Sequence, residues 1–215
     1  MTTVAPDVVR CVVEAPRVSR GAQPGQFVIV RLSEVGERIP LTISESDAED
    51  GTITLVVQML GATTRGFAEL SVGGHLADVL GPLGKPTEIR QFGTCAVVGG
   101  GVGSAIALPV ARALKEAGNT VHAIVGARTS SLLLLLVELA DASDSLTVTT
   151  DDGSQGRKGF VTDALGDLMA SRSIDHVFTV GPIPMMAAVA EATRDAGIPT
   201  VASLNPIMVD GTGMC

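Results

Sequence analysis

Residues 94–117, TCAVVGGGVGSAIALPVARALKEA, decide the fold of this chain. A short apolar run at residues 95–98 leads into a glycine cluster, and an alanine-rich segment with helical spacing follows at once. Glycine has no Cβ, so the backbone can turn tightly there and come close to a ligand. The N–H groups at the start of the following helix suit a phosphate. We therefore predict a nucleotide-phosphate loop formed by Gly99, Gly100, Gly101 and Gly103.

The loop differs from the usual dinucleotide fingerprint. Read as G-x-G-x-x-G from Gly101, the pattern has Ile106 at its third glycine, and read from Gly99 it has Ser104 there. The next apolar run ends in Gly126-Ala127-Arg128, without the acidic residue that holds a ribose. The sequence G-x-x-x-x-G-K-[ST] does not occur either. The pattern favours a phosphate loop of another lineage, and the alternative is a turn that binds nothing.

Composition limits the classes of protein to consider. The chain has 215 residues, enough for one large or two small domains, and a net charge of −8 that argues against nucleic acid or anionic membranes as partners. The apolar run at residues 132–137 is too short to cross a bilayer. No export signal opens the chain, and its three cysteines, an odd number at wide spacing, do not form a disulfide framework. These features predict a cytoplasmic protein.

The first part of the chain, residues 1–92, has the pattern of a small antiparallel β-barrel. Short β-branched runs are separated by turn signals, one helix is expected at residues 63–70, and Gly-Pro-Leu-Gly at 81–84 is expected to break the last strand. The predicted strands are residues 8–13, 27–32, 40–44, 53–59 and 76–80.

Residues 93–204 alternate between strands and helices, which predicts a parallel sheet covered on both faces. The predicted strands are 95–98, 121–125, 146–149, 177–180 and 200–202, and the predicted helices are 103–117, 130–141, 161–170 and 184–196. Ligands of such sheets gather at the carboxyl ends of the strands. Four loops are therefore expected at one edge: 99–103, 126–128, 151–159 and 181–182.

A β-barrel followed by a nucleotide-binding α/β domain resembles the ferredoxin–NADP reductase family over the whole chain. Within that family the resemblance is to the branch of dihydroorotate dehydrogenase electron-transfer subunits, sulfide dehydrogenase subunits and small subunits of NADH-dependent reduced ferredoxin:NADP oxidoreductases. The segments that carry it are 38–42 (RIPLT), 81–84 (GPLG), 99–103 (GGGVG), 150–154 (TDDGS), 156–160 (GRKGF) and 203–215 (SLNPIMVDGTGMC).

The resemblance implies that FAD binds the barrel. Pro40, Leu41 and Thr42 match the segment that passes the flavin ring, with the Thr42 hydroxyl near the reactive nitrogen. Arg38 lies one residue before the family's arginine position, and is either a pyrophosphate ligand or a solvated arginine. Thr63 and Thr64 open the predicted helix, where they either bring backbone N–H groups to the FAD phosphates or cap the helix.

The resemblance assigns NAD(P) to the glycine loop and the neighbouring Gly181-Pro182, with the nicotinamide against the flavin. Arg128 would favour NADP by pairing with a 2′-phosphate, whereas Asp151 and Asp152 would favour NAD by accepting ribose hydroxyls, and the sequence leaves this open. Hydride transfer needs proximity and orientation, not a protein acid or base. The isolated histidines His75, His122 and His176 agree with that expectation.

The last residues, 205–215, resemble the start of a [2Fe–2S] lobe whose first ligands have the spacing C-x4-C-x2-C. Here Asp210 occupies the first ligand position and Cys215 the second. Two ligands cannot hold a cluster that needs four. We therefore expect a cluster in a full-length protein and none in this form. The alternative is a terminal cysteine without a role.

Together with these features, the resemblance implies a FAD-dependent NAD(P)H oxidoreductase that serves as an electron-transfer subunit. Electrons would pass from NAD(P)H through FAD and the cluster to a larger redox subunit in a heterodimer, such as that of a ferredoxin:NADP oxidoreductase or a sulfide dehydrogenase, with ferredoxin as a further partner. Two alternatives stay open. One is the electron-transfer subunit of dihydroorotate dehydrogenase in pyrimidine biosynthesis, and the other is a nucleotide-binding module without redox function.

Overall fold

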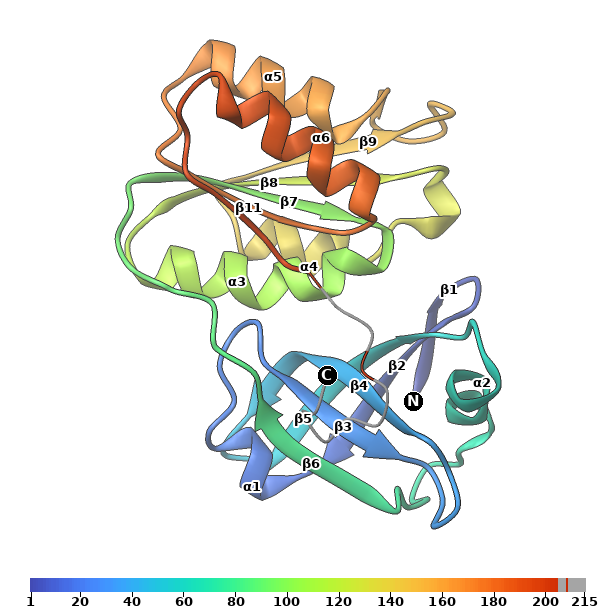
Figure 1. Ribbon diagram of the computed structural model, residues 1–215. Coiled ribbons are helices and arrows are strands. Elements are labelled where there is room, and N and C mark those ends of the chain that lie inside the picture. The colour runs from blue at the N-terminus through green and yellow to red at the C-terminus, as the bar shows by residue number, and fades with distance from the viewer. Residues whose placement is uncertain (205–207, 209–215) are drawn as a thin grey trace. The chain divides into compact units, whose positions relative to one another are not determined.

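The computed structural model describes residues 1–204 and 208 (Figure 1). Residues 1–204 fall into two compact units, Met1–Thr87 and Glu88–Leu204, which are treated separately below. Within the described residues, no helix combines the length and the apolar character needed to span a membrane.

The first unit is a six-stranded antiparallel sheet curled around an apolar core. β4 is ten residues long and pairs with β3 through its first half and with β5 through its second. A register shift between Ile43 and Glu45 separates the two halves, and such irregularities bend a strand. In sheet order the strands are β1 (Thr2–Ala5), β2 (Val8–Glu14), β5 (Thr52–Gln58), β4 (Arg38–Asp47), β3 (Phe27–Arg31) and β6 (Asp78–Leu83).

Three details of this unit differ from the sequence prediction. Two short elements, β1 and α1 (Pro16–Ser19), were not expected, since four residues are too few to show a hydrophobic period. The expected break at 81–84 instead lies mostly within β6. A Cβ on Gly81 would lie 2.7 Å from Val28 Cγ1, so glycine lets β6 run close against β3 there. The predicted helix is present as α2 (Ala62–Glu69).

The second unit is a six-stranded parallel sheet with helices on both faces, as predicted. The helices α3 (Ser104–Glu116) and α4 (Leu136–Asp141) cover one face, and α5 (Val161–Ser171) and α6 (Ile183–Arg194) cover the other (Figure 1). Val97 and Val98 belong to different apolar clusters, one on each side. In sheet order the strands are β10 (Arg157–Lys158), β9 (Ser145–Thr150), β8 (Thr120–Ala127), β7 (Thr94–Gly100), β11 (His176–Val180) and β12 (Thr200–Ala202).

The helix predicted at 130–141 is wrong in its first half. A short 3₁₀ turn, η2 (Ser130–Leu132), is followed by extended residues and by Leu135 at a left-handed φ of 54° before α4 begins. An unbroken helix would spread consecutive leucines around all its faces. The break instead buries Leu134 and packs Leu133 against the core. The two-residue strand β10 was also not predicted.

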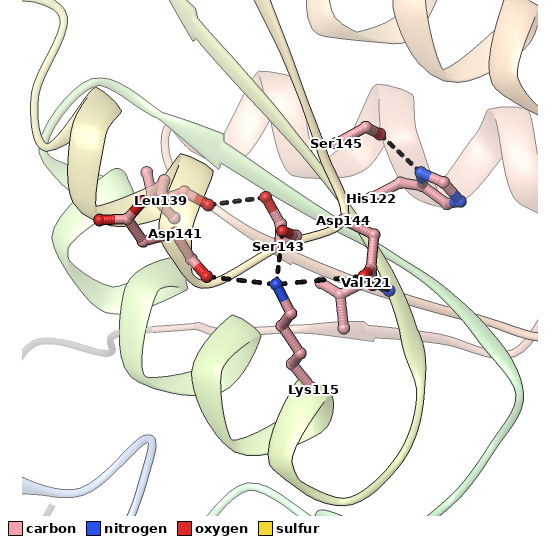
Figure 2. Close-up of polar contacts among 8 residues, drawn as sticks. All are labelled: Lys115, Val121, His122, Leu139, Asp141, Ser143, Asp144 and Ser145. Carbon is pink, nitrogen blue, oxygen red and sulfur yellow. Dashed lines mark hydrogen bonds and ion pairs between the residues drawn. The ribbon is translucent and has the colours of Figure 1, made fainter.

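A lysine joins α3 to α4 and β9 at the amino edge of this sheet (Figure 2). The Lys115 ammonium donates to the carbonyls of Asp141 (3.2 Å) and Ser143 (2.7 Å) and lies 4.0 Å from the Asp144 carboxylate. A cation is favourable at the carbonyl end of a helix, here α4. Asp144 in turn accepts a hydrogen bond from the Val121 amide at 2.8 Å. Lys115 thus has a structural role.

Two buried histidines lie near this amino edge. Arg172 donates to Nε2 of His122 (3.0 Å), so that nitrogen carries no proton, and Nδ1–H donates to Ser145 Oγ (2.6 Å). Burial lowers the pKa of His122, Arg172 lowers it further, and Asp144 opposes the change. Burial also lowers the pKa of His176, whose ring stacks on Phe92 with centroids 4.1 Å apart. Both side chains are therefore held neutral in the fold.

Acidification should destabilise the second unit through these histidines. In the unfolded chain they take up protons below a pKa of about 6.5, whereas in the fold they resist protonation. The two neutral histidines therefore contribute fully to the stability of the fold above that pH. This contribution declines as the pH falls toward the lower pKa that they have in the folded protein. Urea unfolding of His122→Gln should therefore show a smaller loss of stability between pH 7.5 and 5.5 than the wild type (these pH values bracket about 6.5). Equal pH dependence in the two proteins would contradict the assignment.

Candidate nucleotide-binding site

The strand register brings the four predicted loops to one edge of the parallel sheet. Gly99 lies opposite Val180 on β11, and Gly100 lies opposite Gly126 on β8. The carboxyl ends of β7, β8, β9 and β11 are thus level with one another. The loops that start there are 99–103, 126–128, 151–159 and 181–182, as the sequence predicted.

Three glycines of the predicted phosphate loop allow close packing. A Cβ added to Gly99 would lie 3.2 Å from the nearest atom of another residue. The same distance would be 2.4 Å for Gly100 and 2.5 Å for Gly103. At Gly103 that neighbour is the carbonyl oxygen of Val180, which cannot move aside without disturbing β11. These glycines therefore let α3 and the loop after β11 approach the end of β7.

Gly101 differs from the other three glycines. Its φ of 55° lies in the left-handed region, and no atom lies within 4 Å of the position where a Cβ would stand. It opens the 3₁₀ turn η1 (Gly101–Gly103), which continues into the thirteen-residue helix α3. The first N–H groups of a helix lack partners within it and carry its positive dipole end. Open space beside Gly101 therefore fits the approach of a phosphate.

Gly181-Pro182 adjoins this loop. A Cβ on Gly181 would lie 3.1 Å from the Gly100 Cα, so the two loops touch through backbone atoms. Pro182 is exposed and immediately precedes α6. Met185 also borders this loop and was not among the predicted site residues. Its Sδ lies 2.4 Å from the position that a Cβ on Gly100 would take.

The loops after β8 and β9 carry the polar candidates. Arg128 is exposed, and its side chain makes no hydrogen bond or ion pair within the described residues. The Asp151 amide donates to the carbonyl of Ala127 at 3.1 Å. Asp152 accepts hydrogen bonds from Ser154 Oγ (2.6 Å) and from the Ser154 amide (2.9 Å), and these lower its pKa. The carboxyl edge of the sheet thus carries the unpartnered Arg128 side chain on one loop and the ionised Asp152 carboxylate on the next.

The flavin candidates lie in the first unit. Pro40, Leu41 and Thr42 are half-buried on β4, where Thr42 pairs with Phe27 of β3. The Thr42 hydroxyl makes no hydrogen bond to any described residue, so it is available to a ligand. Arg38, at the start of the same strand, is exposed.

The threonines at the start of α2 already have hydrogen bonds. Thr64 Oγ1 accepts from the amides of Gly61 (2.9 Å) and Leu60 (3.0 Å), which makes Thr64 a capping residue. Thr63 Oγ1 donates to Glu37 at 2.7 Å. The amides of the first helical turn still have no partner within the helix, so an anion could bind there through backbone groups.

The predicted cluster ligands Asp210 and Cys215 lie outside the described residues. Among the described residues no group of three or more histidine, cysteine, aspartate or glutamate side chains could hold a metal ion. The iron–sulfur part of the expectation stays a prediction.

Comparison with known proteins identifies the family. Residues 97–191 match the family model described as the oxidoreductase NAD-binding domain. The chain is 48% identical, over 99% of its own length and 75% of the relative's, to a homolog of the electron transfer subunit of dihydroorotate dehydrogenase B (NAD(+)) from Thermotoga maritima. It is 36% identical to the probable subunit of that name from Methanopyrus kandleri, over 90% of this chain and 72% of the relative.

Solved structures agree with this assignment. A chain in the structure of the NADH-dependent reduced ferredoxin-NADP oxidoreductase is 47% identical and superposes with a TM-score of 0.93, over 100% of this chain and 77% of that one. The Amycolatopsis cytochrome P450 reductase shares the fold. It is 22% identical and superposes with a TM-score of 0.77, over 94% of this chain and 66% of that one. These findings confirm the predicted family and fold class. The chain belongs to the ferredoxin reductase family, in its group of electron-transfer subunits related to that of dihydroorotate dehydrogenase B.

Proposed function

We propose that this chain is a FAD-dependent NAD(P)H oxidoreductase that passes electrons to a larger redox subunit. The observation that carries the proposal is the open, left-handed Gly101 at the carboxyl edge of the second unit, in a chain that shares nearly half its residues with the Thermotoga relative. The oxidoreductase described for the solved relative uses NADH and reduced ferredoxin.

We assign NAD(P)H to the second unit. The amides that follow Gly101 would bind the pyrophosphate, while Gly99, Gly100 and Gly103 keep the loop close to the strand ends. Gly181 and Pro182 would border the dinucleotide on the β11 side, and Arg128, Asp151 and Asp152 on the β8 and β9 side. No described histidine lies at this edge: His122 and His176 lie near the amino ends of β8 and β11, and His75 is in the first unit.

We assign FAD to the first unit, with Arg38, Pro40, Leu41 and Thr42 along β4 and the amides of Thr63 and Thr64 as its contacts. The half-buried strip and the unpartnered Thr42 hydroxyl fit a flat ring with a hydrogen-bonding nitrogen. Bound FAD would supply the step from a hydride, which carries two electrons, to single-electron transfer. The residues of this chain bind and orient the reacting groups, and none of them has to move a proton.

Two candidates for the partner follow from the relatives. One is the large subunit of a ferredoxin:NADP oxidoreductase, or of a related enzyme such as sulfide dehydrogenase, and the solved relative favours the oxidoreductase. The other is the catalytic subunit of a dihydroorotate dehydrogenase, favoured by the names of two relatives. Purification of the native complex and identification of the second subunit distinguish them.

The purified protein should carry FAD. Cofactor released by acid should co-chromatograph with FAD, and the absorbance near ~450 nm should bleach anaerobically on addition of NADH or NADPH. FMN in place of FAD would overturn the assignment of the first unit. A folded protein without flavin would instead favour a nucleotide-binding module without redox function.

Substitution of Gly101 should separate nucleotide binding from folding. Gly101→Ala places a methyl group where the phosphate approaches and strains the left-handed backbone by about 1 kcal/mol. Gly197→Ala is the matched control, because Gly197 also has a left-handed φ (65°) and open space but precedes β12 at the amino edge.

Both variants should therefore lose about 1 kcal/mol of unfolding free energy and retain FAD. Only Gly101→Ala should raise the NAD(P)H concentration for half-maximal flavin reduction, by about tenfold or more. If the two variants bind NAD(P)H equally well, the phosphate does not lie at Gly101.

A further inference from the structure

The loops after β8 and β9 are joined beyond the ends of their strands. The amide of Asp151 donates to the Ala127 carbonyl at 3.1 Å, and the amide of Asp152 donates to the Arg128 carbonyl at 3.3 Å. The pairing between the two strands therefore continues into both loops, up to the backbone of Arg128. A second connection, through side chains, lies beyond that residue.

That second connection converges on the hydroxyl of Ser154. Its oxygen lies 2.6 Å from Asp152 Oδ1, 2.8 Å from the amide of Ser130 and 3.3 Å from Thr129 Oγ1. An ionised carboxylate only accepts hydrogen bonds, so the single proton of Ser154 goes to Asp152. The oxygen of Ser154 then accepts from the Ser130 amide, and the Thr129 hydroxyl lies within hydrogen-bonding distance of it. These contacts join the two loops.

These contacts hold the backbone on both sides of Arg128. Its carbonyl is bound to Asp152, and two residues later the Ser130 amide is bound to Ser154. The Arg128 side chain is nevertheless exposed and unpartnered within the described residues. A fixed backbone that carries an available side chain reduces the entropy lost when a ligand binds.

We propose that Ser154 is a positioning residue for the adenosine half of bound NAD(P)H. In open α/β sheets the adenosine ribose lies at the end of the second strand of the nucleotide-binding unit, which here is β8. By holding residues 128–130 there, Ser154 presents Arg128 and Thr129 to the ribose or its phosphate. This inference rests on the proposed function, and it adds a residue that does not itself touch the ligand.

The test compares the two halves of the dinucleotide on the flavin-loaded protein. Calorimetry measures binding of ADP-ribose and its 2′-phosphorylated form, which carry the adenosine half, and of nicotinamide mononucleotide, which carries the other. Ser154→Ala should weaken the tighter of the two adenosine ligands by about fivefold to tenfold and leave nicotinamide mononucleotide unchanged. Half-saturation for flavin reduction by NAD(P)H should rise by the same factor, with an unchanged limiting rate.

Two further variants complete the comparison. Ser154→Thr keeps the hydroxyl and should restore most of the affinity. Ser171→Ala removes another exposed serine hydroxyl, one that donates to the Leu168 carbonyl (2.9 Å) near the end of α5, and should bind every ligand like the wild type. Ser154 is itself exposed, so its replacement leaves the apolar core intact.

The outcomes separate this inference from the function on which it rests. Wild-type affinity in Ser154→Ala, or an equal loss for both halves of the dinucleotide, overturns the role of Ser154 alone. A flavin-loaded wild-type protein that binds neither adenosine ligand and is not reduced by NAD(P)H overturns the proposed function. Failure of Ser154→Thr to restore affinity also counts against the hydroxyl as the positioning group.

Discussion

The arrangement of the second unit depends on direct backbone contact between the glycine loop and the end of β11. A Cβ on Gly103 would lie 2.5 Å from the Val180 carbonyl oxygen, and one on Gly181 would lie 3.1 Å from the Gly100 Cα. Contact this close is possible only because Gly100, Gly103 and Gly181 have no Cβ. It sets the 3₁₀ turn η1 and the start of α3 at the level of the strand ends, next to the open space beside Gly101. The position of the proposed phosphate site is thus a consequence of packing.

The two edges of the parallel sheet have different uses. At the amino edge, polar side chains are used within the protein: Asn119 accepts from the amides of Phe92 (2.6 Å) and Gly93 (3.0 Å) and donates to two carbonyls. Its amide group is therefore fully satisfied, as buried polar groups usually are. At the carboxyl edge, Arg128 and the space beside Gly101 are left available. The groups left available to a ligand thus lie at the carboxyl edge, where the hydrogen bonds of Ser154 hold the loops that carry them.

Much of this could be predicted from the sequence, because the deciding signals are local. The alternation of strands and helices after residue 93 predicts the parallel sheet, and the glycines at strand ends predict which edge carries the candidate site. The break at Leu135 was not predictable, because a run of leucines has no period from which to assign faces. The hydroxyl bridge at Ser154 was missed for another reason. It joins loops 24 residues apart, and the motif that contains Ser154 does not show which residues it will meet.

The described cysteines bear on how electrons can travel. Burial raises the pKa of Cys95 to about 11, with the Asp175 carboxylate adding to the effect, and burial also raises the pKa of Cys11. Reactivity at sulfur requires the thiolate, so both groups stay as inert thiols near neutral pH. Cys95 lies in β7 and Cys11 in β2, each in the interior of its own unit. Neither described thiol is therefore suited to redox chemistry, and under the proposed function electrons would pass through bound groups that the chain positions.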